Sequence, residues 1–87
     1  MPKSIGTTLK ARGKRYGPFK PLAETSQDLQ EVMRKSPNWE GLSADKKEAL
    51  QIIQHKIARM LHGDPEYKDN WHDIIGYSTR IEETLSE

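Results

Sequence analysis

The segment between Ser43 and Gly63 constrains the fold of this chain more than any other part of it. Its apolar residues recur three and four positions apart: Leu50, Ile53, Ile57 and Met60, with Ile52 and Leu61 widening the stripe. Ser43 is a favoured residue immediately before a helix, and Gly63 is a favoured residue immediately after one. The sequence therefore predicts a helix from about Ala44 to His62 with one apolar side.

Two further helices are predicted on either side of it. Pro21 suits the first position of a helix, and Pro37 ends that helix because the residue before a proline avoids the α region. A third helix is expected from about Asp69 to Leu85, with these residues on one side: Trp71, Ile74, Ile75, Ser78, Ile81 and Leu85. No alternating strand pattern is present. The prediction is an all-α bundle of three main helices, the second and third antiparallel.

Charge divides the chain into two parts. Residues 1–20 hold six Lys and Arg, no acid and many Gly and Pro, and they are expected to form an irregular basic arm. Residues 21–87 form the single helical domain and carry eight bases against thirteen acids, a net charge of −5. Such an arm either contacts phosphate or a neighbouring subunit, or is a solvated tail. A short helical turn over Thr8–Arg12 is compatible with its composition.

Composition limits how this chain can be stabilised. Only 33% of the 87 residues are hydrophobic, so the core must be thin. Without cysteine no disulfide can help, which also fits a reducing cytoplasm. Trp39 and Leu42, in the loop between the first two helices, are expected to pack on the core. Self-association is the expected source of further burial, and no apolar stretch is long enough to span a membrane.

Acidic residues at the start of the third helix suggest a metal site. Asp69 and Asp73 lie four positions apart, so their carboxylates share one side of a helix, as Mg²⁺ binding requires. The alternative is that Asp69 caps the helix and Asp73 stabilises its first turn. If the second helix faces them, Glu48 becomes a third carboxylate, and Lys56 and Arg59 become phosphate contacts.

Other polar residues carry weaker signals. The spacing of His55, His62 and His72 does not suit zinc, and they are expected at the surface. The segment 11–19 could cradle a phosphate through Arg15 and its glycines, although it lacks the ending of a Walker loop. A net charge of only +1 does not favour nucleic-acid binding.

A family resemblance rests on three segments: Lys56–Leu61 followed by Gly63, Asp69–Tyr77, and the upstream Arg12…Arg15-Tyr16-Gly17. Together they resemble a phage and prophage protein family related to the MazG-like, all-α nucleoside triphosphate pyrophosphohydrolases. The resemblance implies an oligomer that uses Mg²⁺ to cleave a nucleoside triphosphate. Asp73 matches the last acid of the family's E-x-x-D motif, whereas Asn70 stands in place of its glutamate. On the preceding helix Glu48 keeps one of two expected carboxylates, and Lys56 and Arg59 match basic positions.

Two main hypotheses follow. The first is a nucleotide-binding domain in which Glu48, Asp69 and Asp73 hold the metal and Arg15, Lys56 and Arg59 contact phosphate. The second is a non-catalytic module that has lost the metal site and binds another protein, from the host or the phage, through its helices and its basic arm. Weak nucleic-acid binding by residues 3–20 is a third hypothesis. No catalytic residue is assigned.

Overall fold

Three α-helices make up most of the computed structural model, which describes residues 13–86. They are α2 (Phe19–Lys35), α3 (Ala44–His62) and α4 (Lys68–Glu82), and a helical turn at residues 13–16 precedes α2. The described residues contain no strand. The predicted all-α fold is therefore confirmed. Among these same residues, no helix combines the length and the apolar character needed to cross a membrane.

The ends of the helices agree closely with the signals in the sequence. α3 has the predicted bounds, and the Gly63 amide closes it by donating to the Arg59 carbonyl at 2.8 Å. Ser43 occupies the N-cap position of α3, but its side chain makes no capping hydrogen bond. α2 begins two residues before Pro21, which is tolerated because amides in the first turn have no partner within the helix. α4 ends three residues before Leu85, whose amide instead bonds to the carbonyl of Glu82.

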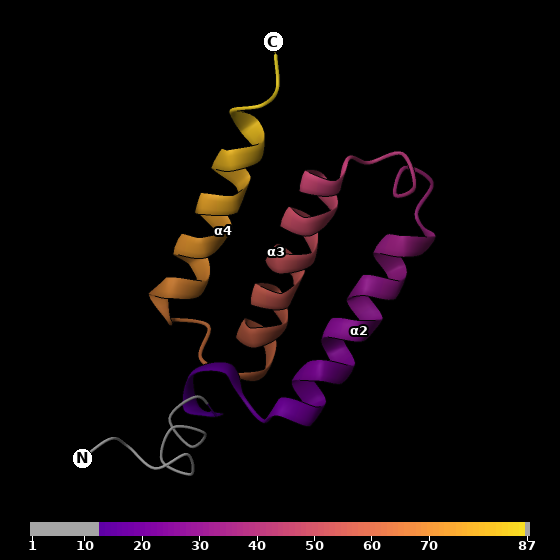
Figure 1. Cartoon of the computed structure of the whole chain (residues 1–87). Helices are drawn as coiled ribbons and strands as arrows, with labels where there is room; N and C mark the ends of the chain where they lie inside the picture. The colour runs from indigo at the N-terminus through magenta and orange to yellow at the C-terminus, as the bar shows by residue number, and fades with distance from the viewer. Residues whose placement is uncertain (1–12, 87) are drawn as a thin grey trace, which may run out of the picture.

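The three helices lie side by side in one layer with α3 in the middle (Figure 1). α3 packs against both α2 and α4, whereas α2 and α4 make no contact with each other. Neighbouring helices run in opposite directions, which confirms the predicted antiparallel arrangement of α3 and α4. A single layer covers the two sides of α3 that face its neighbours and leaves its other two sides uncovered.

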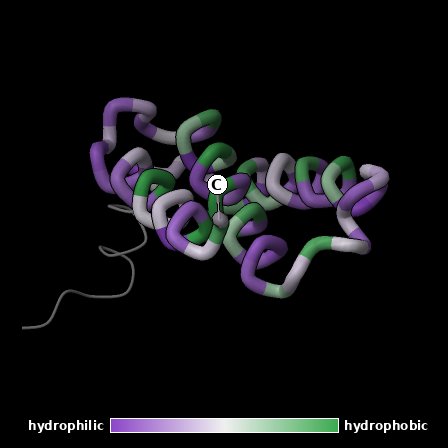
Figure 2. Tube along the Cα trace, turned by 90° about the horizontal axis from the view of Figure 1, so that it is seen from above, coloured by the Kyte–Doolittle hydropathy of each residue, from purple (hydrophilic) through white to green (hydrophobic). Residues whose placement is uncertain are grey.

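The buried core is small. Among the described residues only four hydrophobic side chains are buried: Leu22, Trp39, Ala49 and Ala58. Trp39 was expected to pack on the core from the loop, and it does. Three polar residues are buried beside them: Ser26, Gln54 and Asn70. Figure 2 shows hydrophobic (green) and hydrophilic (purple) residues interspersed along the helical turns.

Part of the predicted apolar stripe remains in contact with solvent. On α3, Leu50, Ile57 and Leu61 are exposed, and Leu61 keeps 65% of its surface accessible. On and after α4, Trp71, Ile75 and Leu85 are also exposed. The spacing of these residues correctly indicated that they share one side of each helix. It could not show that the fold leaves this side without a covering layer.

The predicted division at residue 20 falls inside α2. Residues 1–12, which include the predicted turn at Thr8–Arg12, lie outside the described part of the chain. The remainder of the arm packs on the helices: the Asp64 amide donates to the Arg15 carbonyl at 2.8 Å, in the turn between α3 and α4. Residues 13–18 therefore belong structurally to the helical domain.

Candidate functional site

An ion pair joins two of the predicted site residues across the α3–α4 contact. Lys56 Nζ lies 2.9 Å from Asp73 Oδ2. The Lys56 side chain is 14% exposed and that of Asp73 is 42% exposed. The hydrogen bond from Lys56 holds the pKa of Asp73 below its usual value, and the positive charges of Lys56, His72 and Arg59 act in the same direction. Asp73 is thus already neutralised by a side chain of its own domain.

The other two predicted metal ligands are not gathered around Asp73. Asp69 accepts a hydrogen bond from the Tyr67 hydroxyl at 3.0 Å, which raises the pKa of Tyr67. Glu48 lies eight residues before Lys56 on α3, about 12 Å away along the helix axis. Within residues 13–86 no cluster of three His, Cys, Asp or Glu residues is arranged to hold a metal ion.

Asn70, at the position where the resemblance places a glutamate, is only 1% exposed. Its Nδ2 atom has no hydrogen-bond partner among the described residues. A buried amide with an unused donor cannot replace an accessible carboxylate as a ligand for a cation. The residues present therefore do not fit a Mg²⁺ site, and no chemistry is derived from one.

Arg15 and Arg59, predicted to contact phosphate, lie on either side of a pair of tyrosines. The Arg59 guanidinium carbon is 4.2 Å from the centre of the Tyr16 ring, and that of Arg15 is 5.2 Å from the Tyr67 ring. The two rings meet edge to face with centroids 5.9 Å apart. Lys56, the third predicted phosphate contact, makes the ion pair with Asp73 instead. The sequence places these tyrosines 51 positions apart (67 − 16), so spacing alone gave no sign that they meet.

Two glycines allow this cluster to form. Gly17 has a φ of +87°, and a Cβ atom built on it would lie 2.1 Å from the carbonyl oxygen of His62. A Cβ atom on Gly63 would lie 2.2 Å from the carbonyl oxygen of Arg15. The backbone before α2 therefore crosses the end of α3 at a distance that excludes side chains, and this brings Tyr16 close to Arg59.

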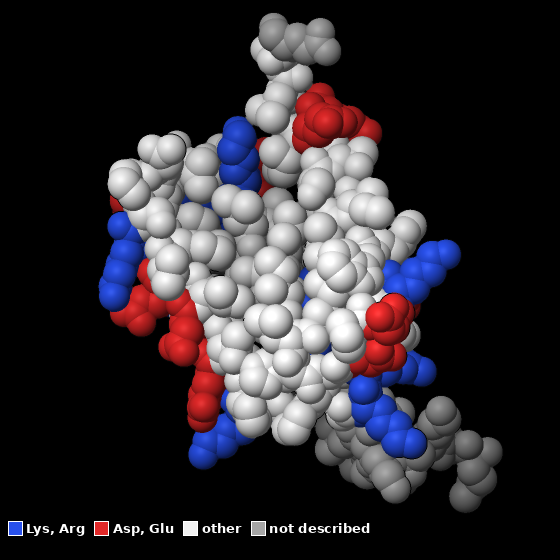
Figure 3. Space-filling view, turned by 180° about the vertical axis from the view of Figure 1, so that it is seen from behind, with Lys and Arg blue, Asp and Glu red and all other residues white. Residues whose placement is uncertain are grey.

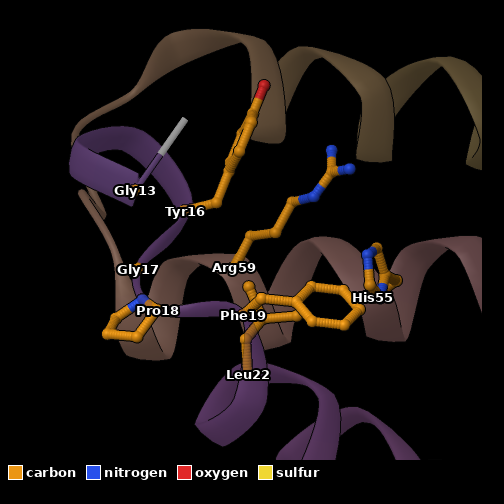
Figure 4. A pocket seen from close by; sticks show the side chains of 8 residues that line it. All are labelled: Gly13, Tyr16, Gly17, Pro18, Phe19, Leu22, His55 and Arg59. Carbon is orange, nitrogen blue, oxygen red and sulfur yellow. The ribbon is translucent and has the colours of Figure 1, made fainter. Parts of the chain in front are cut away.

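The crossing forms one wall of a pocket of about 390 Å³ (Figure 4). Its lining comes from the segment before α2, the start of α2 and one side of α3: Gly13, Tyr16, Gly17, Pro18, Phe19, Leu22, His55 and Arg59. Most of this lining is apolar, and the close-up shows the Tyr16 ring beside Arg59 and the Phe19 ring between Arg59 and His55. Phe19, which sequence reasoning did not single out, is 79% exposed.

The histidines on α3 are not the surface residues that the sequence suggested. Ser26 Oγ lies 3.3 Å from His55 Nδ1, and Thr25 Oγ1 lies 2.6 Å from His62 Nε2, so both rings are bonded to α2. Burial lowers the pKa of His55, and the charges of Arg59 and Lys56 lower it further. His55 is therefore uncharged at neutral pH. Only His72 is exposed as expected.

A second hollow, of about 470 Å³, lies between the first half of α3 and the end of α4. Leu50, Ile53, Ile81 and Leu85 provide most of its apolar lining. Because Leu50, Ile57 and Leu61 are seven and eleven residues apart, they lie along one side of α3. On α4, Trp71 and Ile75 share one side with Ser78 and Glu82, which line this hollow together with Leu50, so the surface continues from α3 onto α4. We call these six exposed residues the apolar face: Leu50, Ile57, Leu61, Trp71, Ile75 and Leu85.

Comparison with known proteins finds no match: no family model, no curated protein and no solved structure is significantly similar to the chain. The resemblance to MazG-like enzymes therefore stays a prediction. The candidate sites rest on the geometry of this chain alone.

Proposed function

We propose that this chain is a helical interaction module that pairs with a second copy of itself through the apolar face. The observation that carries the proposal is the set of six large apolar side chains left in water on α3, on α4 and just after α4. At their exposed fractions they present roughly 600 Å², the upper end of the about 300–600 Å² found for the largest patch of a typical monomer. Each partner of a standard interface buries about 800 Å², so this face supplies most of the area that a stable dimer needs.

The thin core supports a second copy as the partner. A domain is normally built from at least two packed layers, and this one has a single layer with four buried hydrophobic residues in its described part. The fold therefore gains stability whenever the apolar face is covered. A second copy is always present at the same concentration as the first, and it supplies an equally flat layer with the same apolar composition.

The distribution of charge suits this arrangement. Seen from behind, the middle of the layer is a broad area without Lys, Arg, Asp or Glu, and charged side chains gather at its edges (Figure 3). Glu48 and Arg59 lie on the other side of α3, because residues nine and two positions from Ile57 fall roughly opposite it on a helix. A centre depleted of charged residues, with charges at the rim, is the usual anatomy of a protein interface.

A pair of charge substitutions tests the proposal. Ile75→Lys places an ammonium group in the apolar face, whereas Phe19→Lys makes the same kind of change at an exposed position in the pocket on the other side of the layer. By sedimentation equilibrium, we expect the wild type to associate and Ile75→Lys to raise the dimer dissociation constant about tenfold or more. Phe19→Lys is expected to leave it unchanged. An equal effect of the two substitutions, or none from Ile75→Lys, would refute the proposed face.

The nucleotide-hydrolysing hypothesis receives no such support. Its carboxylates are dispersed among the described residues, and Asp73 is paired with Lys56. The second hypothesis, a non-catalytic module that binds another protein chain, requires only an exposed binding surface, and the apolar face is one.

A further inference from the structure

The guanidinium of Arg59 has unused hydrogen-bonding capacity at the pocket before α2. It lies over the Tyr16 ring, but it donates no hydrogen bond and makes no ion pair within residues 13–86. Stacking on a ring occupies the face of a guanidinium and leaves its five N–H donors, which lie in its plane, available to an acceptor. The pocket therefore presents a positive group ready to bind an anion.

No acidic residue is among the described residues that line this pocket. The other ionisable base in this described lining, His55, is uncharged at neutral pH because burial lowers its pKa. α2 begins at the pocket, and its first turn has neither a side-chain cap nor an acidic residue to balance the positive end of the helix dipole. Arg59 and the start of α2 thus favour the same sign of ligand charge.

The rest of the lining favours a flat apolar group. Phe19 is 79% exposed as a residue, although it belongs to the pocket, so its ring can accept another ring. Leu22 and Pro18 add apolar surface, and Tyr16 adds a second aromatic ring to the lining. The volume of about 390 Å³ lies within the range of about 300–1,000 Å³ that is common for small-molecule sites.

We infer that this pocket binds a small ligand with one aromatic ring and one anionic group, the ring against Phe19 and the anion on Arg59. The anion is a phosphate or a carboxylate, and both accept two parallel hydrogen bonds from a guanidinium. No metal ion takes part. Because Arg59 and Ile57 lie on opposite sides of α3, the site stays accessible when the apolar face is covered.

An NMR titration in the presence of EDTA tests the site with four probes. Adenosine 5′-monophosphate and indole-3-acetate combine a ring with an anion, whereas adenosine and inorganic phosphate each supply one of the two. We expect at least one ring-bearing anion to shift the resonances of Tyr16, Phe19 and His55 in a saturable way. The separate parts should bind about tenfold more weakly. Binding of only one ring-bearing anion also supports the site.

Three variants assign the binding to the proposed residues. Arg59→Gln is expected to weaken it about tenfold or more, and Phe19→Ala about fivefold or more. Arg80→Gln is the matched control, because that guanidinium also lies over a tyrosine ring, at 5.5 Å from Tyr77, but does not line the pocket. Since Phe19 is largely exposed, its variant tests the site even if Arg59→Gln disturbs the fold. The inference is overturned if no probe gives saturable shifts at millimolar concentration, if phosphate alone binds as tightly, or if Arg80→Gln weakens binding equally.

Discussion

Gly17 lies against the backbone of His62 at the end of α3, and Gly63 lies against the backbone of Arg15 before α2. The two chain segments cross at this point. A Cβ atom on either glycine would come within 2.2 Å of a backbone carbonyl oxygen of the other segment. Backbone atoms cannot move aside as the end of a side chain can. These two positions therefore fix the wall of the pocket and the place of Tyr16 beside Arg59.

Alanine at either crossing glycine should destabilise the domain strongly. We expect Gly63→Ala to reduce the free energy of unfolding by at least about 2 kcal/mol, because it forces the segments apart. Gly17→Ala adds the cost of a side chain at a φ of +87°. Gly76→Ala, within α4, is the control: a Cβ there meets nothing within 4 Å, and alanine should stabilise the helix by about 0.5–1 kcal/mol. Urea denaturation measures all three, and equal losses would contradict the proposed crossing.

The ion pair between Lys56 and Asp73 should make a modest contribution to stability. A double-mutant cycle with Lys56→Met and Asp73→Asn is expected to give a coupling free energy of about 0.5–1 kcal/mol, because Asp73 is partly exposed. The more exposed Glu31–Lys35 pair within α2, at 3.1 Å, should give about 0.3 kcal/mol. Because the folded state lowers the pKa of Asp73, its contribution is present above pH 3.8 and is lost as the pH falls through the folded-state pKa. A coupling free energy that persists unchanged at pH 2 would show that it does not come from the ion pair between Lys56 and the ionised Asp73.

Magnesium should leave the stability of the domain unchanged. The ammonium of Lys56 already occupies the position beside Asp73 that a cation would take, and no third carboxylate completes a site among residues 13–86. We therefore expect the same midpoint of thermal unfolding in millimolar Mg²⁺ and in EDTA, since only binding to the folded state raises it. A rise with Mg²⁺ that is lost in Asp73→Asn would restore the metal hypothesis.

His55 should make stability depend on pH near neutrality. Burial lowers its pKa below 6.5 in the folded state, so the unfolded chain binds more protons in the window just below pH 6.5. The contribution of His55 to the free energy of unfolding therefore falls as the pH decreases through that window. His55→Gln should remove this part of the slope, and an NMR titration of the imidazole should give its midpoint below 6.5. A midpoint at or above 6.5 would contradict the assigned burial.

Local patterns predicted much of this fold. The apolar period between Ser43 and Gly63 predicted both ends of α3, and Pro37 marked the end of α2. Which side of each helix remained exposed could not be predicted, because helical spacing identifies an apolar side without showing what covers it. Leu61 and Ile75 illustrate this: both fit a core pattern, and both remain in water because α2 and α4 do not close over α3.

The candidate sites were less predictable for the same reason. Lys56 and Arg59 were singled out by charge and position, but their partners Asp73 and Tyr16 come from other elements. Asp69 and Asp73 do share a side of α4. The part of α3 beside them is its second half, whereas Glu48 lies in its first half, so the three carboxylates do not form one cluster. Contacts between elements depend on how the helices are arranged, and spacing along one helix carries no information on that.

The most direct test of the account is an isotope-filtered NOE experiment on the whole chain, with labelled and unlabelled copies mixed in equal amounts. Only contacts between two copies give signals in such a sample. If a second copy covers the apolar face, cross-peaks between copies will connect the Trp71 ring with the methyl groups of Leu61, Ile57 or Ile75. Pairing through the apolar face is contradicted if the chain is monomeric at NMR concentration, or if the cross-peaks between copies arise from other surfaces and leave these four residues without any.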